Sequence, residues 1–317
     1  MTNIPTARAI FLDIDGTYAD HGVAPEAHVE AVRTARKLGH LVFVCTGRPL
    51  AMVPDHILSA GFDGTITGAG ARVELGGEVL KDTRFEQDLA ARIVDVLDAH
   101  DVAYILEAPH ALYGPDGVDR RLRRVLGPIF AARAAAEGNG PAGNGGPAGN
   151  GAANGAGNGA GHHSGRPDPL EDILGPVQYG GDLREVSYAK ISCFDAPLPL
   201  RDLTDTLGPG VGLIPSSLSA LGDGAGEIFM AGTHKAVGIQ VIQERLGLDR
   251  TDIVAIGDSA NDIEMLEYAG IGIGVEGGHP AVLAVADRIT AGPADNGVAL
   301  AFAELGLLKP GAPTLST

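Results

Sequence analysis

Short, wholly apolar runs alternate with helix-like segments at both ends of this chain. Residues 9–12, 41–45 and 253–256 are each predicted to form a buried strand, because every position in them is apolar. Segments with helical signals follow these runs, at residues 25–38, 49–60 and 261–268. Strands that alternate with helices form parallel sheets with helices on both faces. The sequence therefore predicts an α/β fold built on a doubly wound parallel sheet.

The middle of the chain, residues 83–231, has a different pattern. It contains a strongly amphipathic helix at 85–100, a predicted hairpin at 102–113, and further strands and helices without regular alternation. We expect an α+β module here, inserted between the two halves of the α/β core at residues 1–82 and 232–317.

A low-complexity tract lies inside this module. Residues 138–161 contain only glycine, asparagine, alanine and two prolines. Such a tract cannot bury enough apolar surface to offset the entropy of ordering it, so we expect a disordered insertion over residues 138–168. His162 and His163 could bind a metal there, but adjacent histidines are more often solvated. A helix predicted just before the tract should be interrupted or kinked at Pro128.

The charge balance excludes several classes of partner. The formal net charge is −17, which argues against binding to nucleic acid or to an anionic membrane surface. The two cysteines, Cys45 and Cys193, lie far apart and predict no disulfide framework, as in a reducing compartment. We expect no signal peptide, because residues 1–9 lack a basic start followed by an apolar segment, and no membrane span, because no apolar run approaches the ~18–20 residues it needs. The expected location is the cytoplasm.

Two aspartates stand directly after the first apolar run. Asp13 and Asp15 are separated by one residue, and in an extended strand such residues point to the same side. Adjacent carboxylates repel each other unless a cation lies between them or one of them holds a proton. The pair therefore indicates a metal site, an acid/base pair, or both, although Asp and Gly are also common in turns after strands.

Further polar residues occupy equivalent places in the predicted fold. They are Thr46, Gly47 and Arg48 after the second strand, Lys235 at the start of a helix, and Asp258, Asn261 and Asp262 after a late strand. Each group alone has an ordinary explanation as a loop, a solvated lysine or a helix cap. Because ligands bind at the carboxyl ends of strands in open α/β sheets, we expect all of them to face one crevice.

The combined chemistry fits a phosphoryl group beside a metal ion. Asp258 and Asp262 join Asp13 and Asp15, and four close carboxylates require compensation by a hard cation such as Mg²⁺. A carboxylate beside Mg²⁺ that faces phosphorus is a nucleophile, and a second carboxylate can transfer protons. The groups that can hold a tetrahedral anion are Lys235, Thr46, the Gly47 amide and Asn261.

At these positions the chain resembles the haloacid dehalogenase superfamily, and in particular its Cof-type phosphatases. The family's four motifs are matched in order by Asp13-x-Asp15-Gly16-Thr17, Thr46-Gly47-Arg48, Lys235 and Gly257-Asp258-Ser259-x-Asn261-Asp262. The resemblance implies a Rossmann-like core with a cap between the second and third motifs, where the α+β module lies.

The resemblance also implies a role for each matching residue. Asp13 would be the nucleophile and Asp15 the general acid/base. Asp13, the Asp15 backbone carbonyl and Asp258 would bind Mg²⁺, and Asp262 would either bind the metal or support the residues that do. Thr46, Gly47, Lys235 and Asn261 would hold the phosphate, and Arg48 would reach toward the leaving part of the substrate.

Two features depart from the family pattern. Tyr18 stands where the family usually has a small aliphatic residue, and we expect it to touch the entrance of the site. The Gly/Asn/Ala tract is an insertion that would alter the local geometry of the cap, and with it the choice of substrate.

The expected function is Mg²⁺-dependent hydrolysis of a small phosphomonoester, such as a sugar phosphate or a phosphorylated cofactor, through an aspartyl-phosphate intermediate. Three alternatives stay open. A dehalogenase is disfavoured by Asp15, because cleavage of a carbon–halogen bond needs neither a leaving-group acid nor Mg²⁺. A phosphoryl transferase such as a mutase would use the same residues. A non-catalytic protein that binds a phosphorylated metabolite would have no use for Asp15.

Overall fold

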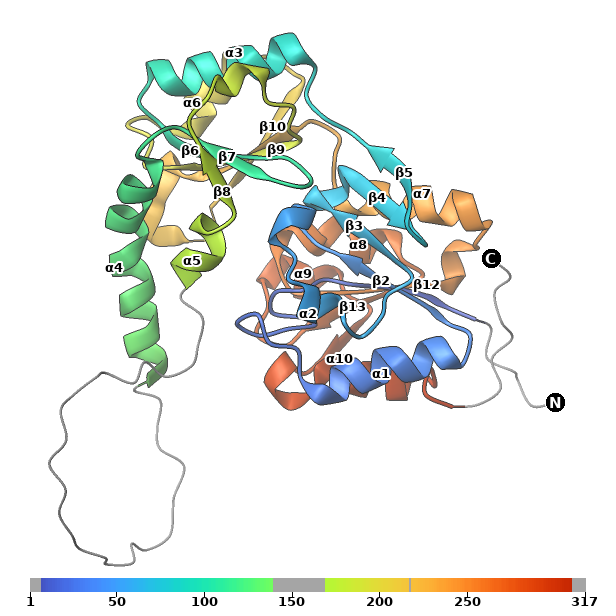
Figure 1. Ribbon diagram of the computed structural model, residues 1–317. Coiled ribbons are helices and arrows are strands. Elements are labelled where there is room, and N and C mark those ends of the chain that lie inside the picture. The colour runs from blue at the N-terminus through green and yellow to red at the C-terminus, as the bar shows by residue number, and fades with distance from the viewer. Residues whose placement is uncertain (1–6, 139–168, 217, 310–317) are drawn as a thin grey trace, which may run out of the picture.

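The computed structural model describes residues 7–138, 169–216 and 218–309, and the strands among them form two separate sheets (Figure 1). The larger sheet is built from both ends of the chain. Its strands are β1 (Ala9–Leu12), β2 (Leu41–Cys45), β3 (Gly64–Thr67), β4 (Arg72–Leu75), β5 (Glu78–Asp82), β12 (Ile253–Gly257), β13 (Ile271–Val275) and β14 (Arg288–Thr290). They lie in the order β14-β13-β12-β1-β2-β3-β4-β5, and all neighbours from β14 to β3 pair in parallel.

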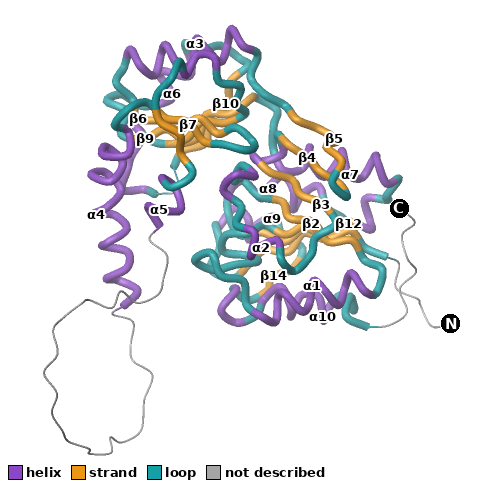
Figure 2. The backbone as a smooth tube through the Cα atoms, in the orientation of Figure 1, coloured by secondary structure: helices purple, strands orange, loops and turns teal. Residues whose placement is uncertain are grey.

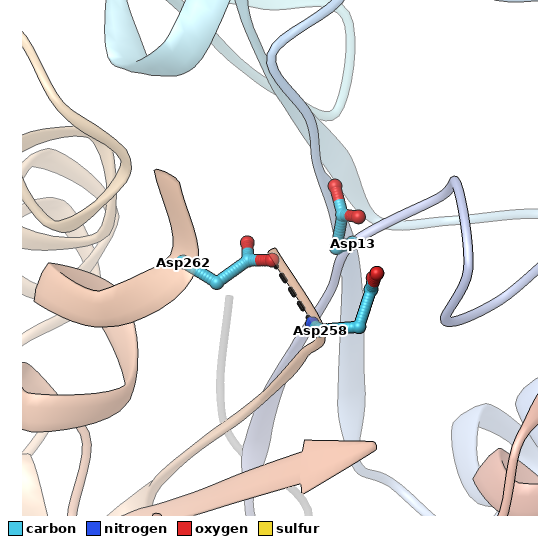
Figure 3. A group of neighbouring side chains, drawn as sticks. All are labelled: Asp13, Asp258 and Asp262. Carbon is cyan, nitrogen blue, oxygen red and sulfur yellow. Dashed lines mark hydrogen bonds between the residues drawn. The ribbon is translucent and has the colours of Figure 1, made fainter. Parts of the chain in front are cut away.

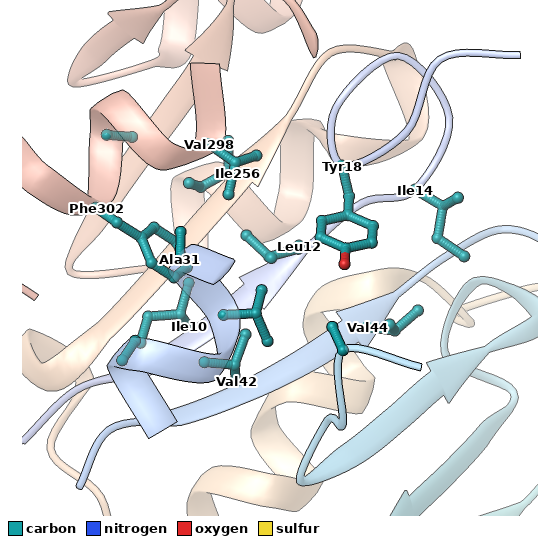
Figure 4. Packing of buried hydrophobic residues seen from close by; sticks show 14 of the residues in the cluster. Ile10, Leu12, Ile14, Tyr18, Ala31, Val42, Val44, Ile256, Val298 and Phe302 are labelled. Carbon is teal, nitrogen blue, oxygen red and sulfur yellow. The ribbon is translucent and has the colours of Figure 1, made fainter. Parts of the chain in front are cut away.

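Helices cover both faces of this sheet, because alternate residues of each buried strand point to opposite sides. Ile10 and Leu12 of β1 pack with α1 (Glu26–Lys37) and α10 (Gly297–Glu304), as Figure 4 shows. Ala9 and Phe11 face the other way, toward helices that lie later in the chain. These are α7 (Lys235–Leu246), α8 (Ile263–Tyr268) and α9 (Pro280–Val285). The predicted doubly wound α/β core is confirmed.

The register of the central strands aligns the segments that carry the motifs. Leu12, the last residue of β1, pairs with Ile256 of β12 on one side and with Val44 of β2 on the other. The Asp13 N–H continues this ladder by donating to the carbonyl of Ile256 at 3.0 Å. The loops after β1, β2 and β12 therefore leave the sheet at one shared edge.

The second sheet belongs to the inserted α+β module, which we call the cap. Its strands are β6 (Ala103–Glu107), β7 (Leu112–Gly114), β8 (Val177–Tyr179), β9 (Lys190–Phe194), β10 (Val211–Pro215) and β11 (Gly226–Met230), in the order β10-β11-β9-β6-β7-β8. One face packs on α3 (Gln87–Ala99) and α6 (Leu200–Asp205), and the other on α4 (Val118–Gly138) and α5 (Pro169–Leu174). Figure 2 shows the cap sheet set apart from the core sheet.

Some sequence expectations are wrong. The helix expected at 49–60 is split into a 3₁₀ turn at Leu50–Met52 and α2 (Asp55–Leu58). Val53 between them is extended, because the ring of Pro54 disfavours helical backbone in the residue before it. Of the interruption or kink expected at Pro128, the interruption is wrong, since α4 continues through that residue.

Other features were not predicted or fall outside the structure. The antiparallel hairpin of β4 and β5 and the edge strand β14 were absent from the expected elements. The expected disordered insertion lies outside the described residues except for Gly138, the last residue of α4, and His162 and His163 lie outside them too. No helix in the described ranges is both long and apolar enough to cross a membrane.

Candidate active site

Lys235 lies at the centre of the shared sheet edge. It is the first residue of α7 and its side chain is fully buried. The Nζ atom donates to Oδ1 of Asp13 at 2.6 Å and to Oδ1 of Asp262 at 2.5 Å. Burial alone would lower the pKa of Lys235, but the negative charges of Asp13 and Asp262 outweigh it and raise that pKa above its usual value. Lys235 is therefore a fixed positive charge whose own side chain is shielded from solvent.

Three carboxylates converge around this lysine. Asp13, Asp258 and Asp262 each offer an oxygen, and these oxygens all lie within 4.8 Å of one another (Figure 3). One ammonium balances only one of the three negative charges. Burial raises the pKa of Asp13, with Lys235 opposing, and burial raises the pKa of Asp258 to about 6. A donor set made only of carboxylate oxygens, with excess negative charge, fits a hard divalent cation.

The oxygens of Asp262 are used to shape the loop after β12. Its Oδ2 accepts hydrogen bonds from the N–H groups of Asp258 at 3.0 Å and Ser259 at 2.9 Å, and from the Ser259 hydroxyl at 3.1 Å. Gly257 permits this close approach, because a Cβ atom there would lie 2.4 Å from the Asp262 carboxyl carbon. Asp262 thus fixes Asp258 and Lys235 in place.

Residues directly after the first aspartates position Asp258 from the other side. Gly16 has φ of +82°, and a Cβ atom on it would lie 2.5 Å from Oδ2 of Asp258. Thr17 donates its hydroxyl to Oδ1 of Asp258 at 2.8 Å. Sequence reasoning gave no role to Thr17 or Ser259, although both stand inside the motifs that carried the prediction.

The segment after β2 brings hydrogen-bond donors to the same edge. The Arg48 N–H donates to Oγ1 of Thr46 at 3.2 Å, so the hydroxyl proton of Thr46 must point elsewhere. Oδ1 of Asn261 accepts from the Ser259 hydroxyl at 2.8 Å, and its Nδ2 lies 3.0 Å from where a Cβ on Gly47 would be. Thr46, Gly47 and Asn261, three of the residues predicted to bind phosphate, are therefore neighbours in the structure.

Asp15 and Arg48 form a separate pair. The Arg48 guanidinium donates to both oxygens of Asp15 at 2.6 Å each, and to the carbonyl of Met52 at 3.1 Å. The Asp15 side chain is half exposed and is not part of the three-carboxylate cluster. In this structure Arg48 reaches toward Asp15, where the sequence predicted contact with the leaving part of a substrate.

The expectation that Tyr18 touches the entrance of the site is wrong. Its side chain is buried in the core, edge-to-face with Phe62 at a centroid distance of 5.4 Å and 6.0 Å from the His28 ring (Figure 4). The loop after Asp15 folds back on the sheet, so that Tyr18 fills space beside α1.

Comparison with known proteins gives a consistent result. The chain matches the family of haloacid dehalogenase-like hydrolases over residues 10–129 and 199–302, which include every predicted site residue. YkrA of Bacillus subtilis strain 168, provisionally named as a phosphatase, is 25% identical over 315 residues, which cover 96% of this chain and 99% of YkrA.

Two further relatives share parts of the chain or its fold. The 5-amino-6-(5-phospho-D-ribitylamino)uracil phosphatase YitU of the same bacterium is 47% identical over 73 residues, which cover 23% of this chain and 27% of YitU. The solved structure of the sugar phosphatase BT4131, described as subclass IIB, aligns with 95% of this chain and 100% of its own at 20% identity. Its TM-score of 0.69 shows a common fold, cap included.

Proposed function

Because the chain belongs to the haloacid dehalogenase-like hydrolases, we propose that it is a phosphatase that hydrolyses small phosphomonoesters with the help of Mg²⁺. One observation supports this proposal most strongly. Asp13 and Asp258, which are 245 residues apart in the sequence numbering (258 minus 13), meet beside the buried ammonium of Lys235. That arrangement suits a phosphoryl group bound next to a cation.

Asp13 and Asp258 would hold the metal, together with the main-chain carbonyl of Asp15. When bound, a divalent cation neutralises charge on the phosphoryl oxygens, so that an anionic nucleophile can approach. Asp262 would act indirectly, because both of its oxygens already accept hydrogen bonds within the protein. The phosphate itself would be held by Lys235, the Thr46 hydroxyl, the Gly47 amide and Asn261.

Hydrolysis would take two steps at Asp13. First, a carboxylate oxygen of Asp13 bonds to phosphorus as the bond from phosphorus to the ester oxygen breaks, and Asp15 gives its proton to that oxygen. Next, Asp15 takes a proton from water as the water oxygen bonds to phosphorus, and the bond between phosphorus and the Asp13 oxygen breaks to release inorganic phosphate. Both carboxyl groups then return to their starting states.

Arg48 adds a condition to this scheme. Its two bonds to Asp15 occupy both oxygens that would exchange a proton with the ester oxygen and with water. We expect the bound substrate to draw the Arg48 guanidinium away from Asp15, toward the phosphate or the leaving group. Asp15 would thus become available only when a substrate is present.

The leaving group is proposed to be a small hydroxylated metabolite, such as a sugar or part of a phosphorylated cofactor. The names of YitU and BT4131 describe substrates of this kind for those proteins. The cap, proposed to span residues 83–231, would close over the bound substrate to exclude bulk water and open to release products.

Hydrolysis of p-nitrophenyl phosphate tests the proposal. D13N should abolish turnover, and excess EDTA should abolish turnover by the wild-type protein until MgCl₂ is restored. D249N removes an exposed carboxylate outside the site and should keep full activity. Full activity in D13N, or in excess EDTA, would contradict the mechanism. Release of halide from a haloacid without metal would point to dehalogenation instead.

A further inference from the structure

A lysine of the cap contacts the segment proposed to bind phosphate. Lys190 begins β9, its side chain is almost completely buried, and its Nζ donates to the carbonyl of Gly47 at 2.9 Å. We propose that Lys190 is a positioning residue that sets the phosphate-binding segment 46–48 and so makes that segment complete only when the cap is seated. This inference rests on the function proposed above.

The cap holds Lys190 rigidly. Its ammonium lies 3.1 Å from Oε2 of Glu227 and 3.2 Å from Oε2 of Glu107, and Glu107 accepts a hydrogen bond from the Ser192 hydroxyl at 2.6 Å. Glu107 pairs directly with Lys190 across β6 and β9. Two carboxylates and one carbonyl therefore surround the ammonium, two of them from the cap and one from the core. The contact with Gly47 is therefore made by a side chain with little freedom to move.

Lys190 donates to the peptide group between Gly47 and Arg48, and the same group orients the Thr46 side chain. The Gly47 carbonyl and the Arg48 N–H belong to the same planar unit. Lys190 donates to the carbonyl end, and the N–H end donates to Oγ1 of Thr46. With this plane fixed at both ends, the Thr46 hydroxyl keeps its own proton free to donate to a phosphate oxygen. Rotation of this peptide plane would break the hydrogen bond from the Arg48 N–H and leave the Thr46 hydroxyl free to turn.

The cap also contacts the residues that follow the phosphate-binding segment. The Ala51 N–H donates to the carbonyl of Pro109 at 2.8 Å, and Met52 packs against the cap cluster around α4. The Met52 carbonyl in turn accepts from Arg48, which also grips Asp15. Cap contacts thus run along residues 47–52, the part of the core that contains the Gly47 amide and Arg48.

The test separates positioning from simple support of the cap. K190M/E107Q removes the contact with Gly47 without leaving Glu107 as an unpaired buried charge. R92M is the matched control, because Arg92 donates to the carbonyl of Leu207 at 2.7 Å inside the cap. For p-nitrophenyl phosphate, kcat and KM are measured together with the inhibition constant of inorganic phosphate, and thermal unfolding reports on the fold.

We expect K190M/E107Q to lower kcat/KM and to weaken inhibition by phosphate, each on the order of 10- to 100-fold. K190R, which keeps a charged donor, should recover part of both losses. R92M should keep wild-type kinetics even if it melts earlier.

Other outcomes overturn the inference. Folded K190M/E107Q with kinetics within twofold of wild type would overturn it while leaving the phosphatase intact, and an equal loss in R92M would do the same. A wild-type protein that hydrolyses no phosphomonoester would overturn both this inference and the proposed function.

Discussion

Two lysines are almost completely buried among the described residues, one in each part of the molecule. Lys235 in the core lies between Asp13 and Asp262, and Lys190 in the cap lies between Glu107 and Glu227. Burial lowers the pKa of each lysine, but the paired carboxylates outweigh burial and raise both pKa values. Similar ion-pair chemistry therefore stabilises a charge in both places.

The surroundings of the two lysines give them different uses. Lys235 is enclosed, and its partners belong to the carboxylate cluster at the sheet edge. Lys190 has one partially exposed partner, since the Glu227 side chain is 37% accessible, and its Nζ donates to a carbonyl of the core. On the roles proposed above, the position of its acceptors decides whether a buried lysine binds ligand directly or links one domain to the other.

The largest effect is expected at Lys235. K235M leaves Asp13 and Asp262 buried without their counter-charge, so it should lower the free energy of unfolding by about 3–5 kcal/mol. Activity should fall by about 10²–10³-fold or more, because an ammonium at the phosphate is lost as well. Urea denaturation and steady-state kinetics measure the two losses. K37M, at an exposed position of α1, should change neither, and a K235M protein as stable as wild type would refute the account of the core lysine.

The cap lysine should contribute less stability. K190M leaves one buried carboxylate, Glu107, without its counter-charge, whereas K235M leaves two, because water can solvate Glu227. K190M is therefore expected to lower the free energy of unfolding by about 1–3 kcal/mol. The comparison is made by urea denaturation of K190M and K235M under identical conditions. A larger loss of unfolding free energy in K190M than in K235M would contradict the order that burial of their partners predicts.

Metal binding should distinguish the two acidic clusters. MgCl₂ at 100 times its dissociation constant should stabilise the wild-type protein by about 2.7 kcal/mol. D258N should abolish this gain. E227Q alters the acidic pair of the cap, Glu107 and Glu227, and should keep the gain. Unfolding with and without MgCl₂ gives the measurement. The same gain in D258N as in wild type would place the metal elsewhere.

Acid should weaken the core through a buried histidine. Nε2 of His28 accepts from the Val298 N–H and Nδ1 contacts the Tyr18 carbonyl, so the neutral ring satisfies both partners. Burial lowers the pKa of His28 below its ordinary 6.5, with its backbone hydrogen bonds opposing. The unfolded chain then binds more protons, so this stabilisation is full above pH 6.5 and declines as pH falls further.

H28Q should remove that part of the pH dependence. Between wild type and H28Q, the slope of unfolding free energy should differ by up to about 1.4 kcal/mol per pH unit in the acid range. Urea denaturation at a series of pH values measures both slopes. Identical slopes would show that His28 does not titrate on unfolding.

The smallest effect is expected at the cap surface. Arg121 pairs with Asp101 at 2.9 Å and with Asp195 at 3.0 Å, but the Asp101 side chain is 92% exposed. R121A should therefore cost only about 0–1 kcal/mol, in contrast with either buried lysine. A loss equal to that of K190M would mean that exposure does not govern these pairs.

The core site could be predicted because its residues follow strands. Asp13 and Asp258 stand directly after apolar runs, and the shared edge of a parallel sheet brings such positions together. Lys190 gave no such signal, because it begins a strand and does not follow one, and its contact with Gly47 depends on packing between domains. Tyr18 was misplaced for the same reason, since its burial depends on how the loop folds against α1.

Some errors were local and avoidable. Pro54 lies inside the helix expected at 49–60, and its ring disfavours helical backbone at Val53, so the sequence itself carries the signal for the break. The hairpin of β4 and β5 turns at Gly76-Gly77, both with positive φ, which is a pattern typical of a two-residue hairpin. The Gly76-Gly77 pair thus predicts the two strands β4 and β5, which the expected sheet lacked.

Covalent capture at Asp13 tests the central claim most directly. D15N should still accept a phosphoryl group from p-nitrophenyl phosphate, whose leaving group needs little protonation, but should fail to activate water for its removal. Intact-mass spectrometry of D15N with MgCl₂ and substrate should then show one added phosphoryl group, and peptide mapping should place it on Asp13. An unmodified D15N, beside a wild-type protein that turns over the same ester, would contradict the account, as would phosphate on any other residue.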